Sequence, residues 1–214
     1  MFEGVEGSGK TTQIDRLRDW LLGNLSQIDR PLKVILTREP GGTALGGRLR
    51  QLLLTQLDPD GEDIQNRAEL LLYGADRAQH VEAILKPHLQ KGHIVLCDRY
   101  TDSTIAYQGY GRGLDLSLIE QVNHLATGGL TSELTLWLDI DVELGLERIR
   151  QQRSVDRIEQ ADLPFHQRVR QGYQTLAHLY PDRIQRVEAG VGIEQVAIQI
   201  QNILKQRFPD LFIA

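Results

Sequence analysis

Residues Gly4 to Thr11 read GVEGSGKT and match the pattern G-x-x-x-x-G-K-[ST]. The glycines at positions 4, 7 and 9 allow the backbone to curl around phosphate oxygens with its N–H groups pointing inward. The amphipathic stretch that follows predicts a helix whose positive N-terminal end faces the same oxygens. This stretch therefore predicts a strand–loop–helix unit that holds a polyphosphate. The residues expected in the loop are Gly4, Val5, Glu6, Gly7, Ser8, Gly9, Lys10 and Thr11.

Three side chains of this loop have distinct expected roles. Lys10 would reach the β- and γ-phosphates of ATP, and the Thr11 hydroxyl would hold Mg²⁺. Glu6 is unusual in such a loop, because phosphates repel a carboxylate. A nearby arginine, a Mg²⁺-bound water or a sugar hydroxyl would stabilise it, so we expect Glu6 to face an acceptor nucleotide instead of ATP.

Four apolar, β-branched runs recur between helical patterns along the rest of the chain. Alternating strand and helix units predict a parallel sheet with helices on both faces, which is the three-layer, doubly wound α/β arrangement of P-loop NTPases. Apolar residues at helical spacing from Ile193 to Leu204 predict the last helix. All 214 residues are expected to form a single domain. The runs are Lys33 to Thr37, His93 to Cys97, Leu134 to Leu138 and Ile184 to Val187.

The first strand is expected to be short. Only Met1, Phe2 and Glu3 precede Gly4, whereas a central strand usually runs about five or six residues. We expect the sheet to have fewer apolar contacts beside the loop as a result.

Composition excludes several other classes of protein. A formal net charge of -5 argues against a dedicated nucleic-acid binder. The single Cys97 offers neither a disulfide framework nor a cysteine-rich metal site. The sequence contains no apolar stretch of about 18 residues and no basic leader, so we expect a cytoplasmic protein with no membrane partner.

The residues Asp98-Arg99-Tyr100 follow a predicted strand and therefore belong at the carboxyl edge of the sheet, where open α/β folds bind ligands. Asp98 suits a contact to Mg²⁺-bound water or the role of a base for the acceptor. Arg99 suits the phosphate that receives the transferred group. Since the chain has no N-K-x-D motif, a GTPase is disfavoured.

The order and spacing of several blocks resemble the thymidylate kinase family over nearly the whole chain. The resemblance implies a phosphotransferase of dTTP synthesis that converts dTMP and Mg·ATP into dTDP and ADP, acting as a homodimer. The blocks are Glu3-Gly4-Val5-Glu6-Gly7 with the rest of the loop, Arg38-Glu39-Pro40-Gly41-Gly42-Thr43, Ala75-Asp76-Arg77, and Asp98-Arg99-Tyr100 through Ser103 to Ala106-Tyr107-Gln108-Gly109.

The resemblance also implies roles for single residues in binding dTMP. Tyr73 would stack on the thymine and Arg77, one helical turn later, would hydrogen-bond its edge. Thr104 and Tyr107 would contact the base and crowd the 2′ position of the sugar. The dTMP phosphate would be bound by Arg38, Arg50 and Arg99.

The polar stretch at residues 150–164 resembles the lid of bacterial thymidylate kinases, which carries a catalytic arginine. An arginine between donor and acceptor phosphates contributes about 10³ to 10⁵ in rate. Arg153 is the favoured candidate, and Arg150 is the alternative. The arginines in and before this stretch are Arg148, Arg150, Arg153 and Arg157.

Two alternatives to a dTMP kinase stay open on the sequence. One is a kinase for another nucleotide or a deoxynucleoside. The other is a protein that binds nucleotides without catalysis because its first strand is short.

Overall fold

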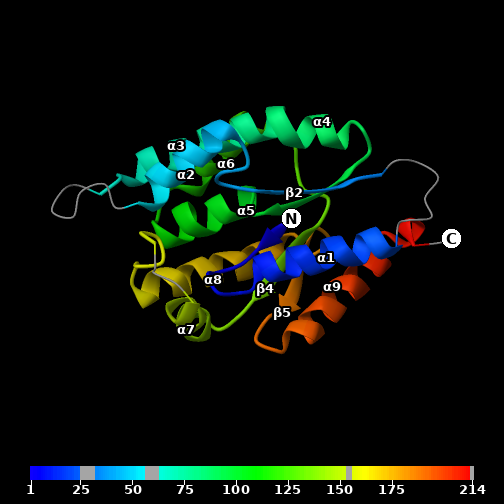
Figure 1. Ribbon diagram of the computed structural model, residues 1–214. Coiled ribbons are helices and arrows are strands. Elements are labelled where there is room, and N and C mark those ends of the chain that lie inside the picture. The colour runs from blue at the N-terminus through cyan, green and yellow to red at the C-terminus, as the bar shows by residue number, and fades with distance from the viewer. Residues whose placement is uncertain (25–31, 56–62, 153–155, 213–214) are drawn as a thin grey trace.

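Strands and helices alternate along the chain (Figure 1). The computed structural model describes residues 1–24, 32–55, 63–152 and 156–212. The strands are β1 (Phe2–Glu3), β2 (Val34–Arg38), β3 (Ile94–Asp98), β4 (Thr135–Asp139) and β5 (Ile184–Glu188). The helices are α1 (Lys10–Asn24), α2 (Ala44–Leu54), α3 (Asn66–His80), α4 (Lys86–Leu89), α5 (Thr101–Thr104), α6 (Leu116–Thr127), α7 (Val142–Gln152), α8 (Leu163–Leu179) and α9 (Ile193–Arg207). The π-helical segments η1 (Val81–Leu85) and η2 (Ile105–Gly111) and the 3-10 helix η3 (Pro209–Leu211) complete them.

The strands form one sheet in the order β2-β3-β1-β4-β5, and all the pairs are parallel. This order confirms the predicted doubly wound α/β fold. Chain order reverses on the two sides of β1, and the crevice at such a switch point is where open α/β sheets bind ligands. The phosphate-binding loop begins directly after β1, so the fold places it at that crevice.

The predicted short first strand is present at the centre of the sheet. Phe2 pairs with Asp98 of β3 and with Leu136 of β4, and both residues of β1 are buried. Three of the other strands start and end one residue later than the apolar runs that predicted them. Polar residues therefore close these strands at the carboxyl edge, where Arg38 and Asp98 are paired in register.

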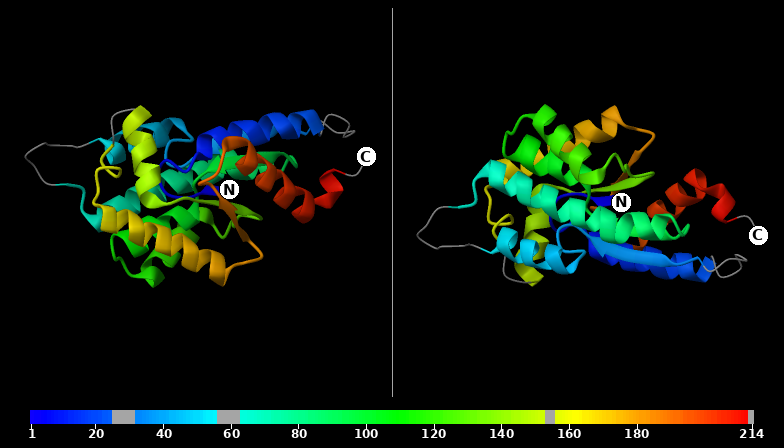
Figure 2. Two further views of the ribbon diagram at one scale, coloured as in Figure 1. Left: turned by 90° about the horizontal axis from the view of Figure 1, so that it is seen from below. Right: turned by 90° about the horizontal axis from the view of Figure 1, so that it is seen from above.

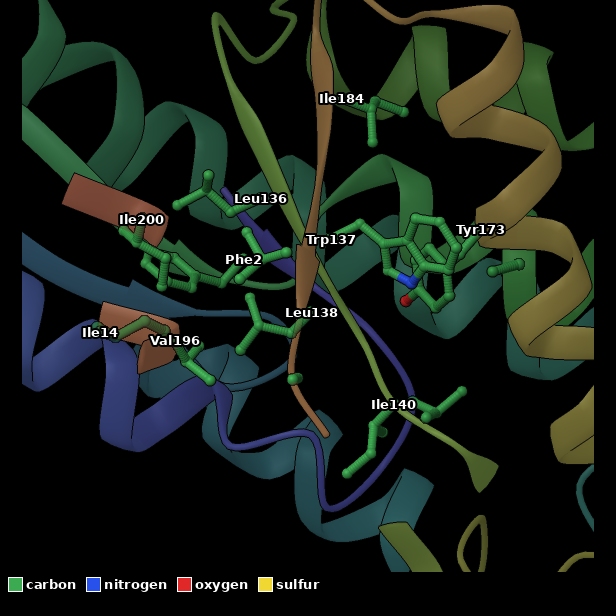
Figure 3. Close-up of a cluster of buried hydrophobic side chains, with 14 of the residues drawn as sticks. Phe2, Ile14, Leu136, Trp137, Leu138, Ile140, Tyr173, Ile184, Val196 and Ile200 are labelled. Atoms are coloured by element: carbon green, nitrogen blue, oxygen red, sulfur yellow. The ribbon is translucent and has the colours of Figure 1, made fainter. Parts of the chain in front are cut away.

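Two layers of helices cover the sheet. In Figure 2, α1 and α9 lie on one side of the strands, and α8 lies with α5 and η2 on the other side. Side chains of β4 alternate between the layers, as the period of a strand requires. Leu138 lies toward Ile14 of α1 and Val196 of α9, whereas Trp137 stacks on Tyr173 of α8 with ring centroids 6.4 Å apart (Figure 3).

The described part of the chain contains no helix long and apolar enough to cross a membrane.

Candidate active site

The carboxyl ends of the strands border one cleft of about 840 Å³. The structure brings almost all the predicted site residues together there. Gly4 and Val5 begin the phosphate-binding loop, and their carbonyl oxygens face the Lys10 side chain. The predicted residues that line the cleft are Glu6, Gly7, Ser8, Gly9, Lys10, Thr11, Arg38, Arg50, Tyr73, Arg77, Asp98, Arg99, Thr104 and Tyr107.

Glycines are required at two points of the phosphate-binding loop. Gly4 has φ 142°, and a Cβ there would lie 2.5 Å from the Leu138 carbonyl oxygen. Gly7 has φ 71°, and a Cβ there would lie 2.0 Å from the Gly145 carbonyl oxygen at the start of α7. The reverse contact is also close, since a Cβ on Gly145 would lie 2.5 Å from the Glu6 carbonyl oxygen. Backbone alone therefore fits between the loop, β4 and α7.

Lys10 is the first residue of α1 and folds back over the loop. Its Nζ donates to the carbonyl oxygens of Gly4 and Val5, each at 3.1 Å, and to Ser8 Oγ at 3.3 Å. Burial lowers the pKa of Lys10, and the neighbouring charge of Arg99 lowers it further. The ammonium is thus held by neutral acceptors that a phosphate oxygen can replace.

Glu6 forms an ion pair with Arg99. This arginine stabilises a carboxylate that phosphates in the loop would otherwise repel. Arg99 Nη2 donates to Glu6 Oε1, and the Tyr107 hydroxyl donates to the same oxygen at 3.0 Å. Burial would raise the pKa of Glu6, but the charges of Arg99 and Lys10 lower it to about 2. Glu6 is therefore ionised and forms an ion pair with the Arg99 guanidinium.

Arg99 has an unusual backbone as well as a crowded side chain. Its φ is 72°, in the left-handed region that non-glycine residues rarely adopt. Its N–H donates to the Phe2 carbonyl oxygen at 2.9 Å, and its Nη1 donates to Gly4 O at 3.1 Å and Ser103 Oγ at 3.2 Å. Such backbone strain is found where surrounding structure enforces it, often at functional sites.

Beneath Arg99 lies a carboxylate that sequence reasoning missed. Glu3 of β1 accepts from the Tyr100 N–H at 2.7 Å, Ser103 Oγ at 2.5 Å and the Tyr173 hydroxyl at 2.8 Å. Burial raises the pKa of Glu3. The only signal in the sequence was an acidic residue in a buried central strand, and nothing local indicated that Tyr173 of α8 would contact it.

Arg77 is buried and held by four groups of the protein. Its Nε donates to Glu39 Oε2 at 2.8 Å, and its Nη1 donates to Thr104 Oγ1 at 2.8 Å and to Asn123 Oδ1 at 2.6 Å. Its Nη2 donates to the Tyr100 carbonyl oxygen at 3.0 Å. The guanidinium therefore presents a fixed edge to the cleft. Glu39 and Asn123 as its partners were not predicted.

Tyr73, Arg38 and Arg50 also line the cleft. Tyr73 is half-buried on α3, and burial raises the pKa of its hydroxyl. Arg50 Nη1 donates to the Pro40 carbonyl oxygen at 3.1 Å, which holds α2 against the turn after β2. Burial lowers the pKa of Arg50, and the nearby charge of Arg38 lowers it further. The two arginines are thus close together in the cleft.

Asp98 and Thr11, the residues predicted to hold Mg²⁺, both line the cleft. Asp98 Oδ1 is buried and has no hydrogen-bond partner among the described residues. Such an oxygen suits a water bound to a hard cation, and the exposed Thr11 hydroxyl is a further oxygen ligand. The described residues contain no group of three or more His, Cys, Asp or Glu side chains that could hold a metal. The pair therefore fits an ion that takes most of its ligands from phosphates and water.

The arginines near the predicted lid go to different places. Arg148 lines the cleft, and its Nη1 lies 3.5 Å from the Gly7 carbonyl oxygen and 3.4 Å from that of Ala189. Arg150 is exposed on α7, and Arg157 turns away from the cleft. Arg153, the favoured catalytic candidate, lies outside the described residues.

A wall near Arg148 was not predicted as part of the site. It is formed by Ala189 and Val191 of the turn after β5 and by Ile193 and Val196 of α9. These side chains are apolar and adjoin a guanidinium, which is a suitable surround for a planar base. They lie on the loop side of the cleft, away from Tyr73.

The comparisons with known proteins agree with this geometry. The family model described as Thymidylate kinase matches residues 2–200. The chain is 58% identical to the thymidylate kinase of Trichodesmium erythraeum, with 97% of this chain and 94% of that protein covered. It is 56% identical to that of a Cyanothece species, with coverage of 97% and 93%. The crystal structure of thymidylate kinase from Ehrlichia chaffeensis superposes with a TM-score of 0.73 at 36% identity, covering 95% of each chain. The chain therefore belongs to the thymidylate kinase family.

Proposed function

We propose that this protein transfers the γ-phosphoryl group of ATP to dTMP, giving ADP and dTDP. In this reaction the bond between the γ-phosphorus and its bridging oxygen breaks, and a bond to a dTMP phosphate oxygen forms. The observation that carries the proposal is that the phosphate-binding loop and the Arg99–Glu6–Tyr107 cluster face one cleft. The donor and acceptor phosphates can therefore be bound next to each other in one cleft.

The donor side is formed by the loop and the apolar wall. The Lys10 ammonium exchanges its carbonyl partners for phosphate oxygens, and the loop N–H groups and the α1 N-terminus add to the attraction. The adenine binds between the Arg148 guanidinium and the side chains of Val191 and Ile193, which line the cleft. Thr11 and Asp98 would hold Mg²⁺, which neutralises phosphate charge when bound.

The acceptor side reads the base and holds the phosphate. Tyr73 stacks on the thymine, and Arg77, fixed by Glu39 and Asn123, donates to its edge. Thr104 at the end of α5 and Tyr107 in η2 border the base and the sugar. Around the acceptor phosphate, the positive charge comes from Arg38, Arg50 and Arg99.

A homodimer in the cytoplasm is also part of the proposal. Two adjacent helices carry apolar stripes at helical spacing whose residues are exposed or half-buried. On α3 the stripe is Leu71, Ala75 and Ala78, and on α6 it is Leu118, Val122 and Leu125. Leu71 and Leu125 are 61% and 84% exposed. A second copy of this chain is the expected occupant of this face.

The test is coupled ADP release with Mg·ATP and each of dTMP, dUMP, dCMP, dGMP, dAMP and thymidine. We expect dTMP to be preferred over dUMP by about tenfold or more in kcat/KM, because the two differ by one methyl group in a packed site. Lys10→Ala is the matched control and should abolish transfer. Equal use of dCMP or thymidine would contradict the acceptor assignment. Tight ATP binding without transfer to any of the six would identify a non-catalytic binding protein.

A further inference from the structure

Glu69 on α3 is a fully buried carboxylate with no role in the site described so far. It lies one helical turn before Tyr73 and is 0% exposed. Its Oε1 accepts from Gln108 Nε2 of η2 at 2.9 Å. Its Oε2 accepts from Arg112 Nη2 at 3.3 Å and from Arg157 Nη2. The Glu69 carboxylate therefore joins α3 to two other segments, which are η2 with its C-terminal end and the turn that contains Arg157.

Arg157 is held almost entirely by the acceptor side of the molecule. Its Nε donates to the Leu53 carbonyl oxygen at 2.8 Å, and its N–H donates to the Leu54 carbonyl oxygen at 3.2 Å. Its Nη1 lies 3.2 Å from the exposed Asp63 carboxylate. The Arg157 side chain is only 6% exposed and is absent from the cleft lining in the described part of the chain. It is placed as an anchor and does not face a phosphate.

The neighbours of Arg157 in sequence do line the cleft. Asp156, Ile158 and Glu159 form part of its wall, and Asp156 Oδ1 accepts from the N–H groups of Ile158 and Glu159, each at 3.0 Å. Asp156 is also near enough to Arg50 for its charge to oppose the effect of burial and of Arg38 on that residue's pKa. The position of this turn therefore sets the electrostatic environment of an arginine of the acceptor site.

We propose that Glu69 is a positioning residue for phosphoryl transfer, which fixes the wall at residues 156–159 to the helix that carries Tyr73 and Arg77. The link is the buried Glu69–Arg157 ion pair. Because Gln108 follows Tyr107 and also binds Glu69, the base site and this wall share one support. The inference rests on the proposed dTMP kinase activity.

The kinetic test compares Glu69→Gln with Asp63→Asn. Both changes remove one carboxylate partner of Arg157, but only Glu69 is buried. We expect Glu69→Gln to lower kcat/KM for dTMP by about 10- to 100-fold with the KM for ATP unchanged, since small displacements at an acceptor site cost that much. Asp63→Asn should behave like the wild type, because an exposed ion pair contributes little. Equal kcat/KM for dTMP in wild type and Glu69→Gln would overturn the proposal.

A second readout does not depend on activity. Arg157→Gln breaks the link from the other side and leaves α3 unchanged, so it serves if Glu69→Gln fails to fold. In either variant we expect faster amide hydrogen exchange in residues 156–161, with α9 unchanged as the internal reference. Unchanged exchange in that segment would overturn the proposal. A wild type that transfers nothing to dTMP would end the proposed function, and the exchange data alone would then decide the role of Glu69.

Discussion

At the scale of single residues, Arg99 adopts a backbone conformation that is usually unfavourable in proteins. Arg99 has a left-handed backbone, which costs about 1–2 kcal/mol for a residue with a Cβ. Its N–H bond to Phe2 and its ion pair with Glu6 hold it there, so the guanidinium stays in one place in the cleft. This residue illustrates preorganisation: strain accepted in the folded state fixes the charge before substrates bind.

Asp76 gives a prediction for pH at the same scale. Burial raises its pKa to about 6, although the Gly41 N–H donates to its Oδ1 at 3.1 Å. A raised pKa means that the folded state is favoured at low pH and loses this advantage as pH rises through about 6. Asp76→Asn removes the titration, so its unfolding free energy relative to wild type should increase by about 2–3 kcal/mol between pH 4 and pH 7.5.

Urea unfolding at the two pH values measures this difference. Asp15→Asn, on the exposed face of α1, is the control for the loss of one negative charge. If both variants follow the pH dependence of the wild type, the ionisation of Asp76 does not oppose folding.

Helix α2 shows how much one element depends on its neighbours. It starts after Thr43, whose Oγ1 accepts from the Gly46 N–H at 2.9 Å, and it carries two successive glycines. A Cβ on Gly46 would lie 2.3 Å from Asp76 Oδ1, whereas a Cβ on Gly47 meets nothing within 4 Å. Both positions are helical, but Gly46 packs against α3 and the turn before α2, whereas Gly47 faces open space.

We predict opposite effects for alanine at these two positions. Gly47→Ala should raise the unfolding free energy by about 0.5–1 kcal/mol, because alanine loses less backbone entropy in a helix. Gly46→Ala should lower it by about 1–3 kcal/mol, because the Asp76 carboxylate and the turn that it holds must shift. Thermal unfolding of the two variants decides the matter, and a gain in both would mean that α2 and α3 separate easily.

The helices, strands and loops could be predicted from the sequence, but the contacts between distant segments could not. The loop at Gly4 to Thr11 and the strand runs follow from local spacing and periodicity, and Asp98 was placed by the end of its strand. Arg38 was named only through the resemblance to the family. Glu3 and Tyr173 are separated by 170 residues, and Glu69 and Arg157 by 88. No local pattern carries such pairs, because they arise only when the sheet order brings distant segments together.

At the scale of the whole molecule, the proposed function assigns the two nucleotides to different halves of one cleft. The proposed donor half is lined by residues of the N-terminal loop and of the last strand–helix turn, and the proposed acceptor half by residues of α2, α3 and η2. Helix α3 of the acceptor half and the adjacent helix α6 carry the apolar stripes proposed for the dimer. A dimer built on this face would stiffen the acceptor half, because it packs against the back of the helix that carries Tyr73.

The dimer prediction can be tested on the folded protein. Leu71→Asp combined with Leu125→Asp should shift the wild-type dimer to a monomer in light scattering, because each buried leucine contributes about 2 kcal/mol to association. Leu179→Asp is the matched control, since Leu179 is 63% exposed on α8, away from these stripes. A wild type that is monomeric at all concentrations would contradict the prediction.

The two glycines that meet between the phosphate-binding loop and α7 have a consequence for how this protein can vary. Gly7 and Gly145 touch through backbone atoms alone, so the contact has no side chain that could adjust. In most packed pairs a larger residue at one position is offset by a smaller one opposite, but no residue is smaller than glycine. A change at either position therefore has no compensating change at the other, and any lineage or library that keeps the activity must keep both together.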